Sequence, residues 1–256
     1  MGGFVYDGIH SSSFDLIVTK VTRSLLPPIR ENTETVPGRP GVFDFGMEFD
    51  ARKISVTCYL KTGSDATLWQ RARAIAEWLN PYKGVKDLYF DDEPGKVYRA
   101  RVSGDLDLEQ LMARLGQFSL EFTCPDPFAY AASDDHVEIS SVGAHEFTRQ
   151  GTANSRPLIR IYGTISGNSV DAIVATFNNS DTVRYVGQLN ASSYIEIDCD
   201  AFTVVRVSGS TRTNALSGLY SLVFPELLPG LNTVNISTIG NAQFTRLDIQ
   251  CRSRWL

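Results

Sequence analysis

The sequence predicts a mainly β protein with two domains: an α+β first domain that carries one packed helix, and a β-sandwich as the second. Apolar and polar residues alternate in many short runs, a pattern typical of strands with one buried face. Helical spacing of apolar residues recurs in one stretch, between Leu68 and Leu79. A chain of 256 residues is long enough for two domains.

The domain boundary is predicted just after the stretch FSLEFTCPDPFAY, at residues 118–130. Apolar residues alternate through its first half, which predicts a strand. Pro125 and Pro127 end that strand, because proline donates no ladder hydrogen bond and favours extended backbone before it. The chain then turns polar. We therefore expect a first domain at residues 1–132 and a second at residues 133–256.

The first domain is predicted to hold short strands and the helix in alternation. The cleanest strand is 51–60, where Ile54, Val56, Cys58 and Leu60 share one parity. The helix follows, with Ser64 or Asp65 as its N-cap and an Asn-Pro pair as its end, and it should lie across a sheet face. Other strands are expected at 4–6, 14–18, 88–90, 97–103 and 118–124.

Residues 25–46 form an unusual segment, with Pro and Gly clusters around a polar centre. Such a length is long for a connection inside a compact domain, so the segment is either a disordered loop or a protruding hairpin. We favour an arm that orders against a neighbouring chain, because several of its residues tolerate strand geometry. The predicted contact residues are Ile29, Arg30, Thr33, Thr35 and Val36.

The second domain shows no helical spacing. Turn signals separate its apolar runs, for example at Gly167-Asn168 and Pro229-Gly230. Many short strands at this spacing predict a β-sandwich. The expected strands are 136–142, 157–162, 170–177, 182–186, 194–198, 202–207, 233–237 and 244–252.

The cysteines predict a protein that keeps its thiols reduced. Each of the four cysteines lies on the apolar, core-facing side of a predicted strand, and none belongs to a CxxC pair: Cys58, Cys124, Cys199 and Cys251. We therefore expect four buried free thiols rather than disulfides or a zinc site. This fits a protein that folds in a cytosol.

Composition excludes several classes of function. The net charge of −5 offers no general basic field for nucleic acid. No apolar run of about 18 residues exists that could span a bilayer, so no membrane insertion is expected. The N-terminus also lacks the basic-then-apolar pattern of a secretory signal.

No catalytic motif is present, so the sequence predicts no enzyme, no metal site and no cofactor. The three histidines do not form a metal-binding helix, and no phosphate-binding loop, dinucleotide fingerprint or GxSxG elbow occurs. Two acidic groups, at 91–93 and at Asp105, Asp107 and Glu109, could bind calcium or act as an acid/base pair. We favour solvated turns for both.

Exposed aromatic residues on a β-sandwich can bind sugars by stacking on the ring faces. Tyr185, Tyr194 and Tyr220 are the candidates for glycan stacking in the second domain. Packing in the core or on a strand face is the favoured role for each of them.

The order of these features resembles the siphophage distal tail protein family over nearly the full length. In the first domain the resemblance lies in ARKISVTCYL, the helix up to LNPYKG, DLYFDDEPGKVYRARV and FSLEFTCPDPFAY. In the second it lies in YIEIDCDAFTVV, LYSLVFPELLPGLNTVNIS and LDIQCRSRWL. One departure is Ser208-Gly209, where the family usually has an Asn-Gly turn.

The resemblance implies a structural component of the virion at the tail tip, assembled in the host cytoplasm. Its first domain would build a homohexameric ring around an open channel, and its second would be a galectin-like or carbohydrate-module-like sandwich. The implied partners are the tail tube protein and a tail hub, tail-associated lysin or fibre proteins. DNA would pass through the lumen without specific binding, which a negative net charge suits.

Two other functions remain open at this point. The sandwich could be a carbohydrate-binding module that recognises the host. Alternatively, the acidic turn at residues 91–93 could belong to a hydrolase, although no set of nucleophile, base and orienting residue accompanies it.

Overall fold

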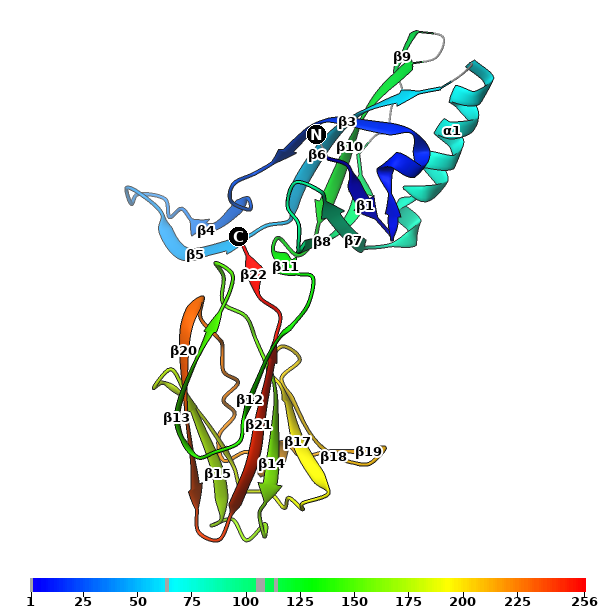
Figure 1. Cartoon of the computed structure of the whole chain (residues 1–256). Coiled ribbons are helices and arrows are strands. Elements are labelled where there is room, and N and C mark those ends of the chain that lie inside the picture. Colours follow the sequence, from blue (N-terminus) through cyan, green and yellow to red (C-terminus); the bar gives the residue numbers. More distant parts are fainter. Residues whose placement is uncertain (1, 63–64, 105–108, 113–114) are drawn as a thin grey trace. The chain divides into compact units, whose positions relative to one another are not determined.

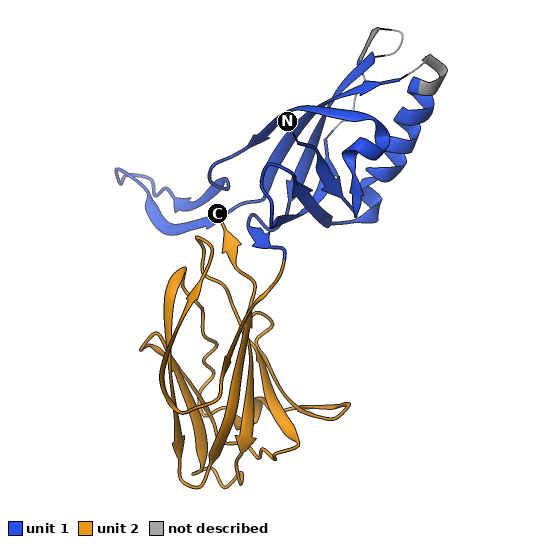
Figure 2. Cartoon of the chain, in the orientation of Figure 1, with its two compact units in different colours: residues 1–132, 256 blue, residues 133–255 orange. Residues whose placement is uncertain are grey.

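The computed structural model describes residues 2–62, 65–104, 109–112 and 115–256. The chain divides into two compact units, residues 1–132 with residue 256, and residues 133–255 (Figure 2). Strands dominate both units, which confirms the predicted mainly β class (Figure 1). No helix within the described ranges is long and apolar enough to cross a membrane.

The first unit is built on a sheet with the strand order β2-β1-β7-β8-β10-β6-β3. Within this unit, β11 also pairs with β8 and β9 pairs with β10. The strands are Phe4–Tyr6 (β1), Ile9–His10 (β2), Leu16–Arg23 (β3), Arg52–Lys61 (β6), Lys86–Phe90 (β7), Lys96–Ser103 (β8), Glu109–Met112 (β9), Leu115–Cys124 (β10) and Ala129–Ala131 (β11). A short 3-10 helix, Ser11–Phe14, precedes β3.

Strands β6 and β10 form the centre of this sheet, and they pair antiparallel along their whole length, from Arg52 opposite Cys124 to Lys61 opposite Leu115. Their buried residues alternate with accessible ones, so one face of each strand supplies the core. The strands predicted at 51–60 and 118–124 are thus confirmed.

Helix α1 (Asp65–Trp78) is the one α-helix among the described residues, and it packs its apolar stripe on the sheet, as predicted. Leu68, Ile75 and Trp78 are buried. The Trp78 ring stacks 5.6 Å from Phe4, and its indole Nε1 donates a 2.9 Å hydrogen bond to the carbonyl of Tyr6. A 3-10 turn, Pro81–Lys83, follows the helix. Of the two predicted N-caps, Ser64 lies outside the described residues.

The acidic turn between β7 and β8 is used for structural contacts. Each carboxylate of the turn has a basic partner: Asp91 lies 3.2 Å from His10, Asp92 lies 2.5 Å from Arg23, and Glu93 lies 2.8 Å from Lys96. Among the described residues, no group of acidic, histidine or cysteine side chains could hold a metal ion. The second acidic group includes Asp105 and Asp107, which lie outside the described residues.

The second unit is a sandwich of two antiparallel sheets, with the strand orders β12-β21-β14-β17-β18-β19 and β13-β20-β15-β16 (Figure 1). The strands are Asp135–Ile139 (β12), Gly143–Arg149 (β13), Leu158–Thr164 (β14), Ala172–Phe177 (β15), Asp181–Tyr185 (β16), Ser193–Asp198 (β17), Thr203–Ser208 (β18), Thr211–Asn214 (β19), Gly230–Ile239 (β20), Gln243–Cys251 (β21) and Arg254–Trp255 (β22). A 3-10 turn, Leu216–Gly218, lies between β19 and β20.

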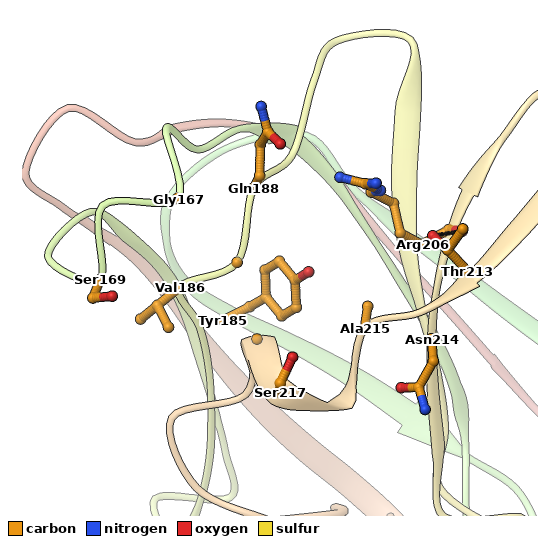
Figure 3. Close-up of a pocket in the computed structure, with 12 residues that line it drawn as sticks. Gly167, Ser169, Tyr185, Val186, Gln188, Arg206, Thr213, Asn214, Ala215 and Ser217 are labelled. Carbon is orange, nitrogen blue, oxygen red and sulfur yellow. Dashed lines mark hydrogen bonds between the residues drawn. The ribbon is translucent and has the colours of Figure 1, made fainter.

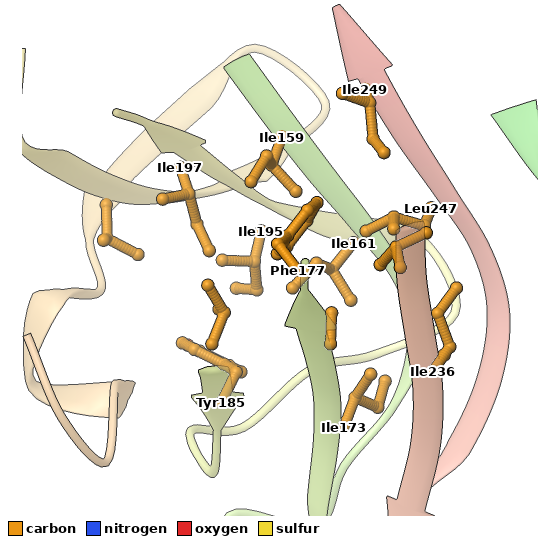
Figure 4. Close-up of a cluster of buried hydrophobic side chains, with 14 of the residues drawn as sticks. Ile159, Ile161, Ile173, Phe177, Tyr185, Ile195, Ile197, Ile236, Leu247 and Ile249 are labelled. Carbon is orange, nitrogen blue, oxygen red and sulfur yellow. The ribbon is translucent and has the colours of Figure 1, made fainter. Parts of the chain in front are cut away.

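The core of the second unit lies between its two sheets (Figure 4). Ile159, Ile161 and Ile195 of the larger sheet face Ile173 and Phe177 of the smaller one, and all are buried. These residues occupy every second position of their strands, as the alternation in the sequence predicts.

All four cysteines are free and buried, at the apolar positions that the strand patterns predict. Burial raises the pKa of Cys58, Cys124 and Cys199 to about 12, and that of Cys251 to about 11. The thiolate is therefore scarce at neutral pH, and these side chains act as small apolar core groups.

Three strands of the second unit were not predicted, namely β13, β19 and the two-residue β22. Strand β13 begins with Gly143, Ala144, His145 and Glu146, and these residue types have low strand propensity. Its composition therefore does not predict a strand. Strand β19 consists of Thr-Arg-Thr-Asn with every residue exposed. Tertiary pairing with β20 and β18 holds β13 and β19 as strands although no apolar alternation marks them.

Candidate interaction surfaces

The arm predicted at residues 25–46 contains a two-stranded hairpin. Strand β4 (Ile29–Glu34) pairs antiparallel with strand β5 (Phe43–Phe49), so the hairpin ends at Phe49 rather than at Gly46. A bulge interrupts the pairing beyond Glu31, and Gly46 on the facing strand has φ +94°, which favours glycine. All residues from 28 to 50 are exposed.

Strand β5 carries a row of exposed apolar side chains, which form the apolar strip. The strip consists of Phe43, Phe45, Met47 and Phe49, which alternate with Asp44, Gly46 and Glu48. Phe45 is 69% exposed and Met47 is 70% exposed. Phe49 contacts Phe128 of the same unit, with ring centroids 6.1 Å apart. Because the register shifts between Met47 and Asp44, Phe43 lies on the face of the hairpin opposite Met47 and Phe49. Exposed apolar side chains on a hairpin indicate a surface that another surface covers.

The hairpin also has two free edges, because among the described strands β4 and β5 pair only with each other. A two-stranded hairpin is marginally stable in water by itself, and unpaired strand edges accept further strands. Together with the apolar strip, this arrangement suits docking onto a protein surface.

The predicted contact residues lie on the hairpin, but they carry less apolar surface than the strip. Ile29 is 48% exposed and pairs with Phe49, while Arg30 forms an ion pair with Glu48. Thr35 and Val36 lie in the loop beyond β4. The strip itself was missed, although the run FDFGMEF shows the period of two that would have revealed it.

The three predicted glycan-stacking tyrosines do not come together. Tyr185 is 2% exposed in the core, so its ring has no free face. Tyr194 lies with its ring centroid 5.0 Å from that of Tyr162. Tyr220 is 68% exposed, and the Arg184 guanidinium lies 4.3 Å from its ring centroid. A shared stacking platform therefore does not form.

A polar cleft of about 330 Å³ opens beside Tyr185 in the second unit (Figure 3). Its walls come from the loop after β16, from β18 and β19, and from the 3-10 turn that follows them. The side chains of Arg206, Thr213 and Ser217 line it together with Tyr185. Sequence reasoning missed this cleft, because only the register of β18 places Arg206 there.

Comparisons with known proteins identify the first unit and the fold of the whole chain. The family described as a phage tail protein RIFT-related domain, Sipho_tail, matches residues 10–124. No curated protein sequence matches the chain. Among solved structures, the Dit protein of phage SPP1 covers 100% of both chains, with a TM-score of 0.79 and 17% sequence identity.

Two structures of the phage p2 baseplate in its activated conformation also match. The structure with Sr covers 98% of both chains, with a TM-score of 0.47 and 10% identity. The structure with Ca covers 97% of both chains, with a TM-score of 0.44 and 9% identity. Residues 10–124 thus match the Sipho_tail family and the full length has the fold of SPP1 Dit, in agreement with the resemblance to siphophage distal tail proteins.

Proposed function

We propose that the protein is a distal tail protein whose copies form a hexameric ring at the tail tip. The ring would join the tail tube protein to the tail hub or baseplate, where a tail-associated lysin or fibre proteins attach. The full-length fold match supports this, since the SPP1 protein is described as a paradigm of the hub adsorption apparatus in phages that infect Gram-positive bacteria.

The exposed hairpin with its apolar strip is the observation that carries the ring proposal. A closed ring needs a patch on each copy that meets a different patch on the next copy. The strip offers Phe45 and Met47 as large apolar groups that such a contact would bury. The free edges of β4 and β5 would add backbone hydrogen bonds to the neighbour.

The channel of the ring would let DNA pass at ejection without holding it. The net charge of −5 supports this, because each contact between a basic side chain and a phosphate would tighten binding. The four buried free thiols fit folding and assembly in the host cytoplasm before incorporation in the virion.

The mass of the purified full chain in native conditions tests the proposal. Light scattering after size-exclusion chromatography should give six times the chain mass of 28.3 kDa. The purified protein should also bind isolated tail tubes in a pull-down. A sample that stays monomeric at high concentration and does not bind tail tubes would overturn the proposal.

A further inference from the structure

The cleft beside Tyr185 contains an arginine in an unusual position. Arg206 lies opposite Ile195 in the pairing of β17 with β18, and Val204 lies opposite Ile197. Since Ile195 and Ile197 are core residues, the Arg206 side chain projects from the inward face of β18. It is half-buried and lines the cleft.

Arg206 has no ion-pair partner among the residues that the structure describes, and no carboxylate lines the cleft. The adjacent Arg212, by contrast, is paired with Glu196 on the outer face of the same sheet. Inward-facing charges normally have a partner of opposite sign, because desolvation is costly. A negatively charged ligand would provide that partner.

Tyr185 supplies a second polar group from the opposite sheet. Its ring is wedged between Gly187 and Gly218, where an added Cβ would come within 2.4 Å and 2.5 Å of ring or hydroxyl atoms. Figure 3 shows the hydroxyl on the side of Arg206. Burial raises the pKa of Tyr185 while the charge of Arg206 acts in the opposite direction, so the hydroxyl stays a donor at neutral pH.

Backbone hydrogen bonds hold this arrangement in place. The amide of Val186 donates to the carbonyl of Gly218 at 2.8 Å, and the amide of Ala215 donates to the carbonyl of Val204 at 2.9 Å. These bonds tie the loop after β16 and the 3-10 turn to their neighbours. The polar groups are therefore presented on a rigid frame, which lowers the entropic cost of binding.

The remaining lining narrows the chemistry of the ligand. Neutral polar side chains line the cleft together with the arginine, namely Ser169, Gln188, Thr213, Asn214 and Ser217. Such a wall disfavours an apolar ligand, and the absence of a free aromatic face disfavours a nucleobase. Hydroxyl and amide groups around one cation suit a ligand with many hydroxyls and one negative charge.

We propose that this cleft binds a single acidic sugar residue, with Arg206 on its carboxylate or phosphate group and Tyr185, Thr213 and Ser217 on its hydroxyls. The volume of about 330 Å³ lies at the lower end of small-molecule sites, which fits one sugar ring rather than a long oligosaccharide. The site lies wholly in the second unit, so its failure would leave the ring proposal untouched.

Saturation-transfer NMR on the full chain tests the site with four probes: glucuronate, glucose 6-phosphate, neutral glucose and inorganic phosphate. Glucuronate or glucose 6-phosphate should bind with a dissociation constant on the order of 1 mM, normal for so small a ligand. The tighter binder of these two sugars shows whether the cleft prefers a carboxylate or a phosphate group. Absence of binding by both would overturn the proposal. It would also be overturned if glucose or phosphate alone bound as tightly as the acidic sugars.

Matched variants assign the binding to the cleft. Arg206→Gln should weaken binding of the acidic sugar about tenfold or more, because it removes a charge-assisted hydrogen bond. Arg212→Gln makes the same charge change at the adjacent, outward-facing residue and should leave binding within about twofold. Equal losses in the two variants, or no loss in Arg206→Gln, would contradict the assignment.

A third variant separates the hydroxyl of Tyr185 from its packing. Tyr185→Phe keeps the ring between its two glycines and should weaken binding about fivefold without changing the melting temperature. Unchanged binding by this variant would remove Tyr185 from the site.

Discussion

Replacing Phe45 and Met47 together by serine should break the ring while leaving the subunit folded. Each side chain is about 70% exposed, and full burial of such a side chain stabilises by about 1.5–3 kcal/mol. Covering the exposed part would thus contribute about 1–2 kcal/mol for each, or about 2–4 kcal/mol per subunit contact. The association constant of one contact should fall about 30-fold to 700-fold.

Light scattering over a dilution series measures this loss directly. At protein concentrations where the wild type forms the ring, the double variant should elute as a monomer of 28.3 kDa. Its circular dichroism and unfolding curve should match the wild type, because both side chains already lie in solvent. Each contact around a closed ring is weakened, so assembly should be lost cooperatively.

Leu222→Ser is the matched control, because Leu222 is also 70% exposed but belongs to the second unit rather than to the hairpin. It should leave the oligomer intact. An intact hexamer in the double variant at the dilution where the wild type begins to dissociate would refute the role of the strip. Equal dissociation of the Leu222 variant would show that general surface hydrophobicity, rather than the hairpin, drives association.

Three further predictions concern the subunit itself. Trp78→Ala should lower the free energy of unfolding of the first unit by about 3–5 kcal/mol in urea titrations, because a buried, stacked ring is lost. As a control, Trp69→Ala should lower it by less than about 1 kcal/mol, because Trp69 is half-exposed. The four thiols should not react with Ellman's reagent at pH 8 until urea unfolds the chain, since burial raises their pKa to about 11 or 12. Burial acts to raise the pKa of Glu93, but hydrogen bonds from Lys96 and Tyr98 outweigh it and hold the pKa below the ordinary value of 4.5. The stabilising contribution of Glu93 is therefore complete above pH 4.5 and is lost as the pH falls through the lowered pKa. The difference in free energy of unfolding between wild type and Glu93→Gln should shrink between pH 7 and pH 3. A difference that stays constant over this range would contradict the prediction.

The fold could be predicted where one face of an element is buried. Ile54, Val56 and Cys58 mark β6 because the core removes every second side chain from water. Leu68 and Ile75 likewise mark α1, because they recur at helical spacing on the face that the core buries. Strand β19 carries no such pattern, because all its residues are exposed and only its pairing with β18 makes it a strand.

The interaction surfaces were harder to predict, for two different physical reasons. The polar residues of β4 dominate the arm, and the apolar strip of β5 continues beyond Gly46, where the arm was predicted to end. The cleft could not be predicted because its charge comes from Arg206, and the sequence of β18 does not show on which face of the strand this side chain lies. The register with β17 decides that face, and residues 203–208 alone do not reveal the register.

The two proposed surfaces differ in chemistry, and this makes them separable by experiment. The strip on β5 is apolar and open, so serine there removes contact area with a macromolecule and leaves the polar cleft unchanged. Arg206 is a half-buried cation in a polar wall, so glutamine there removes a charge that the hairpin does not use. Each variant is thus a control for the other: Arg206→Gln should retain the hexamer mass, and the Phe45 and Met47 double variant should retain binding of the acidic sugar per subunit. If the double variant also lost sugar binding, the cleft would be complete only in the assembled ring, and its assignment to one isolated unit would be wrong.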